Sequence, residues 1–122
     1  MNKSKLTGNT GEEIAKNYCE SSLNIKIVDK NYKCSIFGEI DLVGYKNNTY
    51  YFIEVKTRAN DNFMDIYEVV NKRKQKALVN AAKYYILKNK LNKNYAFTID
   101  LITINQTTNN LQYYSNIVTV NL

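Results

Sequence analysis

The stretch GEIDLVGYKNNTYYFIEVKTR, residues 38–58, places charges at alternate positions on both sides of a polar turn. Two precede the turn and two follow it: Glu39, Asp41, Glu54 and Lys56. Carboxylates that lie close together attract divalent cations, and magnesium prefers oxygen ligands of this kind. The stretch therefore makes a cation site one candidate, provided that the chain brings Asp41 and Glu54 together.

Two strand-like runs, EIDLVGY and TYYFIEVKT, would position these charges. Both are rich in β-branched and aromatic residues, and the two asparagines between them tolerate the positive φ of a tight turn. A hairpin with those asparagines at its tip places Asp41 opposite Glu54 and Glu39 opposite Lys56, all on one face. The other face is expected to pack into a core with Ile40, Leu42, Ile53 and Val55.

The expected pairing of Asp41 with Glu54 is unfavourable by itself. At about 5 Å and an effective dielectric of about 20, the repulsion is about 3 kcal/mol, against about 0.2 to 1 kcal/mol from a good cross-strand pair. Glu39 opposite Lys56 would be an ordinary ion pair. Either both acids splay into water, or a divalent cation lies between them, and the residues alone leave both alternatives open.

The order Asp, turn, Glu-x-Lys resembles the PD-(D/E)xK nuclease active site. That resemblance implies that Asp41 and Glu54 bind magnesium, with manganese as a substitute, and that Lys56 positions or activates the attacking water. Such a metal would polarise a phosphate oxygen and lower the pKa of its bound water. The resemblance favours the metal site over two solvated acids.

The chain also resembles the YraN family of small bacterial proteins over nearly its whole length. The blocks GEIDLV and FIEVKTR carry this resemblance, with weaker matches at Gly11, Glu12 and Ala15, at Asn31-Tyr32 and at Lys74-Gln75. Relatives usually carry Phe-Gly and Pro where residues 63–66 read FMDI, and Arg-Phe-Asp where residues 98–100 read TID. The resemblance implies an α/β, restriction-endonuclease-like core of order αβββαββ, with a mixed sheet flanked by helices.

The first helix is expected from Thr10 to about Ser21, with Thr10 and Glu13 forming a capping box. Glu12 would lie on the same side as the apolar Ala15. As a first-turn acid it complements the helix dipole. The family resemblance offers the alternative that Glu12 is a further metal or water ligand.

A second helix is expected from near Asn71 to about Lys90, with an apolar stripe of Leu78, Ala81, Ala82 and Tyr85. Its first turn is basic, which opposes the helix dipole but favours a bound phosphate. The predicted nucleic-acid contacts are Arg58, Lys72, Arg73, Lys74 and Gln75. The alternative is a solvated basic turn.

The remaining segments predict three more strands. Ile25 and Ile27 alternate with polar residues, and a polar loop is expected at 29–35. Residues 95–104 and 111–120 read as two closing strands, joined by a turn at 105–110.

Composition bounds the class of protein. The length of 122 residues fits one domain, expected at 10–122 after a flexible segment 1–9. Seventeen basic and eleven acidic residues give a net charge of +6, which favours a polyanion such as DNA as partner. No apolar run reaches the roughly 20 residues of a membrane span and no signal peptide is recognisable, so a cytoplasmic protein without membrane contact is expected. Two cysteines and no histidine argue against a zinc site.

The function favoured by the resemblance is magnesium-dependent hydrolysis of phosphodiester bonds in DNA, with branched or structured DNA as a candidate substrate. The alternative is a non-catalytic nucleic-acid-binding module that retains the nuclease fold. The oligomeric state stays open, a dimer included.

Overall fold

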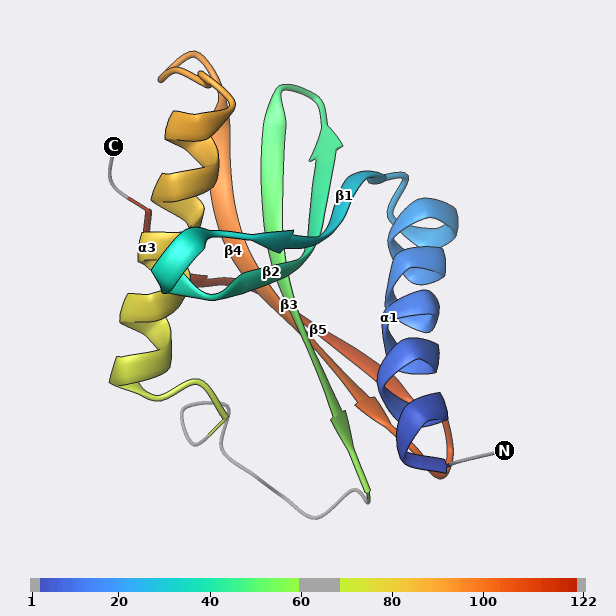
Figure 1. The fold of residues 1–122 in the computed structure, drawn as a ribbon. Coiled ribbons are helices and arrows are strands. Elements are labelled where there is room, and N and C mark those ends of the chain that lie inside the picture. The colour runs from blue at the N-terminus through green and yellow to red at the C-terminus, as the bar shows by residue number, and fades with distance from the viewer. Residues whose placement is uncertain (1–2, 60–68, 121–122) are drawn as a thin grey trace.

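A computed structural model describes residues 3–59 and 69–120 of the chain, with side chains from residue 10 onward. In chain order its elements are α1 (Lys3–Ser22), β1 (Lys26–Lys33), the short 3-10 helix η1 (Ser35–Phe37), β2 (Glu39–Lys46), β3 (Thr49–Arg58), α3 (Lys72–Lys88), β4 (Ala96–Asn105) and β5 (Leu111–Val118) (Figure 1). This confirms the predicted order αβββαββ, which is consistent with a restriction-endonuclease-like core. None of the described helices is long and apolar enough to cross a membrane.

The five strands form one mixed sheet in the order β1-β2-β3-β4-β5, in which only β3 and β4 run parallel. A parallel pair needs a crossover, and α3 lies within the connection from β3 to β4. The sheet lies between α1 on one side and α3 on the other (Figure 1).

Each helix closes its own hydrophobic core against one face of the sheet. On the α3 side, Phe52 and Leu101 pack with Leu78 and Ala82. On the α1 side the core is formed by Ala15, Cys19, Ile25, Leu42, Ile53, Ile102 and Ile104. Cys19 and Cys34 are both buried and form no disulfide. The site-bearing strands are thus held from both faces.

The hairpin of β2 and β3 has the predicted turn and register. Asn47 and Asn48 have φ of 50° and 64°, the left-handed values that a two-residue hairpin turn requires. The ladder pairs Lys46 with Thr49 at the turn and continues to Leu42 opposite Ile53.

The predicted start of the first helix is wrong, because α1 begins at Lys3 rather than at Thr10. Thr10 therefore lies inside the helix and is not an N-cap, so the capping box with Glu13 is wrong as well. Threonine and glycine weaken a helix by up to about 1 kcal/mol each without stopping it. Met1 and Asn2 lie outside the described residues, and the flexibility expected of segment 1–9 stays a prediction.

The polar loop predicted at 29–35 is also wrong, because β1 continues to Lys33. β2 pairs with it along this length, and Tyr32 packs edge to face on Tyr85 of α3 with ring centroids 4.7 Å apart. Tertiary packing here overrides the polar composition. Asn31 in this strand has a φ of 50°. The ribbon of β1 and β2 passes from the α1 side toward the α3 side (Figure 1).

The predicted face of Ile40 is wrong. Ile40 packs in the α3 core, whereas Leu42 packs in the α1 core. The strict alternation along β2 ends between these two residues. The second helix and the closing strands are confirmed, with Asn71 as the N-cap of α3. The segment 63–66, where a departure from the family pattern is expected, lies outside the described residues.

Candidate active site

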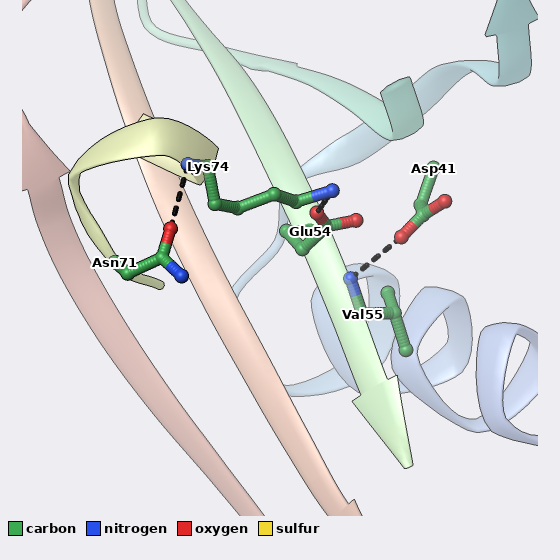
Figure 2. A network of polar contacts seen from close by, with 5 residues as sticks. All are labelled: Asp41, Glu54, Val55, Asn71 and Lys74. Carbon is green, nitrogen blue, oxygen red and sulfur yellow. Dashed lines mark hydrogen bonds and ion pairs between the residues drawn. The ribbon is translucent and has the colours of Figure 1, made fainter. Parts of the chain in front are cut away.

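The site lies where β2 separates from β3. Their ladder ends at Leu42 opposite Ile53, and the residues of β2 before that point pair only with β1. Val55 of β3 is left without a backbone acceptor on this side. Asp41 provides the acceptor instead, because its Oδ2 accepts a hydrogen bond of 2.8 Å from the Val55 N–H (Figure 2). Asp41 therefore has a structural role in addition to any chemical one.

Glu54 is largely buried beside Asp41, with a side chain that is 12% exposed. Its Oε2 is fully buried, and no described donor reaches that oxygen with hydrogen-bond geometry. The Lys74 ammonium group contacts it as an ion pair, with Nζ 2.7 Å from Oε2. In Figure 2 the Glu54 carboxylate lies between Lys74 and Asp41. A single lysine thus supplies the charge that balances Glu54.

The first turn of α3 holds Lys74 in place. The side chain of Asn71 accepts a hydrogen bond of 2.9 Å from the Lys74 backbone N–H, which is a standard N-cap. Lys74 also lies four residues before the buried Leu78, so it is on the helix side that faces the sheet. This spacing is the sequence signal that could have placed Lys74 at the site rather than only at a nucleic-acid surface.

Asp41 and Glu54, called the carboxylate pair below, lie close together, and Glu12 adds negative charge near Asp41. Burial raises the pKa of the Asp41 carboxyl to about 8, with a further contribution from Glu54 and a smaller one from Glu12, while the Val55 N–H opposes the shift. The expected closeness of the two acids is therefore present, although the strand ladder stops just before them. Glu12 acts on Asp41 through its charge.

Gly11 explains how Glu12 comes this close. A Cβ at position 11 would lie 2.4 Å from Cγ2 of Thr57, so α1 packs against β3 at a distance that only glycine allows. Glu12 follows directly and is half-buried. Even so, the part of the chain that the structure describes contains no group of three or more Cys, Asp and Glu side chains arranged to bind one metal ion.

The carboxylate pair nevertheless fits a small divalent ion. A cavity of about 10 Å³, roughly the space of a single water, borders Asp41 and Glu54 and is otherwise lined by Glu39 and by apolar core residues. Magnesium is usually held by one or two carboxylates and keeps several of its waters. Two carboxylates match this number of protein ligands.

The predicted pairing of Glu39 with Lys56 is wrong. Glu39 pairs with Lys33 of β1, and among the described residues it forms no ion pair with Lys56, because β2 has left β3 before this point. Lys56 is exposed and follows Glu54 by two residues on the same strand, so both side chains point to the same side of β3.

The predicted nucleic-acid contacts have different surroundings. Lys72 and Arg73 are exposed at the start of α3. Gln75 is half-buried, and its Nε2 donates a hydrogen bond of 3.0 Å to the Val70 carbonyl, which braces the segment before the helix. Arg58 is half-buried at the end of β3. Of the five, Lys72 and Arg73 are best placed to meet a partner.

Comparison with known proteins identifies one family. The model of the uncharacterised protein family UPF0102 matches residues 11–104. A UPF0102 protein of Clostridioides difficile strain 630 is 40% identical over 100 residues, which cover 82% of this chain and 85% of the relative. Another, of Caldanaerobacter subterraneus subsp. tengcongensis, is 41% identical over 82% of this chain and 80% of its own. A third, of Clostridium botulinum, is 36% identical over 89% and 87%.

Proposed function

This chain belongs to the uncharacterised protein family UPF0102, also called YraN, and we propose that it is a metal-dependent nuclease acting on DNA. The proposal joins the resemblance to the PD-(D/E)xK active site with the arrangement of the chain's own residues. The proposed reaction is hydrolysis of a phosphodiester bond. The observation that carries the proposal is the carboxylate pair, in which the largely buried Glu54 lies beside an acid of raised pKa. An arrangement that costs stability in this way is typical of functional sites.

Each residue of the site has a part in this proposal. Asp41 and Glu54 would hold magnesium, which would polarise the scissile phosphate and lower the pKa of a bound water. Lys56 is exposed and follows Glu54 on the same side of β3, and it would orient the attacking water and balance negative charge. Glu12 adds negative charge near Asp41 and so favours a bound cation.

The charge of α3 supports a nucleic acid as the substrate. The helix contains six of the 17 basic residues of the chain and none of its 11 acidic residues, so the rest of the chain carries 11 of each. The whole excess of +6 is therefore located on the helix that begins at the carboxylate pair. Helix starts bind phosphate through free N–H groups, and the exposed Lys72 and Arg73 add charge there.

The second candidate is a nucleic-acid-binding module without catalysis. It is favoured by the Lys74 contact, which already balances Glu54 without a metal, and by the lack of a three-residue metal group among the described side chains. Both candidates require DNA binding. They differ in whether a metal ion and a cleavage product are found.

A cleavage assay separates the two candidates. Labelled linear, flapped and four-way DNA is incubated with the protein in magnesium, in manganese and in EDTA, alongside Glu54→Gln. The nuclease proposal expects metal-dependent products from the parent and none from the variant. Equal binding by both proteins with no cleavage by either would support the binding module instead.

A further inference from the structure

The cation position next to Glu54 is already filled by a side chain of the protein. Lys74 Nζ lies 2.7 Å from Glu54 Oε2, which is the oxygen that the proposed metal site would use. We propose that Lys74 is the resident counter-ion of the carboxylate pair, and that a divalent metal ion binds there by displacing its ammonium group. This inference rests on the proposed function, because it concerns the same metal site.

The two cations cannot occupy the position together. Magnesium binds carboxylate oxygens at about 2.0 to 2.1 Å and completes an octahedron with waters. An ammonium group 2.7 Å from the same oxygen would lie among those ligands and would repel the metal. Metal binding at Glu54 and the Lys74 contact therefore exclude each other.

The Lys74 side chain can move away from Glu54 without disturbing the fold. Its backbone N–H is fixed by Asn71, whereas its side chain is 46% exposed, against 12% for Glu54. The ammonium group can therefore turn toward solvent while the helix start stays in place. Neither the sheet nor the N-cap has to change.

Nucleic acid provides the alternative partner for that ammonium group. Lys74 belongs to the same first turn as the exposed Lys72 and Arg73, where a phosphate is favoured by charge and by free N–H groups. A phosphate bound there would attract Lys74 away from Glu54 and leave the carboxylate pair without its counter-ion. Metal and DNA would then each strengthen the binding of the other, as linkage requires.

Metal affinity without DNA tests the displacement directly. Manganese binding is measured by electron paramagnetic resonance or calorimetry for the parent, for Lys74→Gln and for Lys76→Gln. Lys76 is an exposed lysine on the same helix and serves as the matched control, because its loss removes the same charge. We expect Lys74→Gln to bind manganese about tenfold more tightly than the parent, the scale of one lost partly buried ion pair, and Lys76→Gln to stay within about twofold.

A conservative variant guards against effects of folding. Lys74→Arg keeps the charge and should bind manganese no more tightly than the parent. If Lys74→Gln and Lys76→Gln change the affinity equally while the parent binds manganese, the displacement is wrong and the metal site stands. If neither the parent nor any variant binds manganese, the proposed function fails together with the inference.

The coupling to phosphate has its own measurement. Manganese affinity is measured again with an uncleavable phosphorothioate duplex present. DNA should tighten manganese binding by a larger factor in the parent than in Lys74→Gln, because the variant has no ammonium group to withdraw. An equal factor in the two proteins would contradict a role of Lys74 in the coupling.

Discussion

Replacing Asp41 with Asn should stabilise the metal-free protein, although Asp41 accepts a hydrogen bond. The carbonyl oxygen of Asn can still accept from the Val55 N–H, 2.8 Å from Asp41 Oδ2, but it brings no negative charge next to Glu54. The raised pKa of Asp41 shows that the folded protein disfavours the carboxylate there. The substitution removes that cost and keeps the contact.

The size and pH window of the effect follow from the pKa of Asp41. It is about 8 in the folded protein, against 3.8 for an ordinary aspartate, so between these values the folded state keeps a proton that the unfolded state has lost. Stability of the parent then falls as pH rises from about 4 to about 8, at up to about 1.4 kcal/mol per pH unit. With allowance for partial solvent screening, the gain from Asp41→Asn at pH 7 is expected at about 1 to 3 kcal/mol.

Urea denaturation in EDTA across pH 4 to 8 measures this gain. The stabilities of parent and variant should converge near pH 4 and separate as pH rises. In a Glu54→Gln background the gain should shrink, because one source of the raised pKa is gone. An Asp41→Asn protein that is less stable than its parent across the whole range would show that the charged hydrogen bond to Val55 outweighs burial, and would refute the reasoning.

Three further variants test the roles of Lys56, of the basic start of α3 and of Gly11. Lys56→Ala should abolish magnesium-dependent cleavage of the DNA panel and leave manganese binding nearly intact; full cleavage by a nuclease-free preparation of the variant would remove Lys56 from the mechanism. Lys72→Gln with Arg73→Gln should weaken DNA binding on all sequences and lower the slope of log affinity against log salt by about 0.9 per lost contact on duplex, so an unchanged slope would mean a solvated turn. Gly11→Ala should lower stability by about 1 to 2 kcal/mol, because the new Cβ meets Thr57 Cγ2, and in a Thr57→Ser background the same substitution should become neutral or stabilising. A neutral effect in the parent background would mean that α1 is not held this closely to β3.

The elements that local signals specify could be predicted from the sequence. Two asparagines with positive φ fix the hairpin turn, and the turn fixes the register of every pair back to Leu42. The start of α3 at Asn71 follows from its N-cap preference, and its buried stripe follows from the helical period. These features depend on residues that are close together in the sequence.

The surroundings of the carboxylate pair could not be predicted in the same way, because they depend on distant contacts. β2 leaves β3 at Asp41 since its preceding residues follow β1 toward α3, where Tyr32 packs on Tyr85. Local alternation therefore predicted wrong partners for Glu39 and a wrong face for Ile40. The Lys74 contact joins residues 20 positions apart, and only the spacing of Lys74 from Leu78 hinted at it.

The central claim is that the carboxylate pair binds a divalent ion, and a crystal soaked in manganese tests it most directly. The account predicts an anomalous density peak between Asp41 and Glu54, with the Lys74 ammonium group turned away from Glu54. The claim is wrong if Lys74 Nζ remains in contact with Glu54 Oε2 and no peak appears between the two acids at a manganese concentration that saturates other sites.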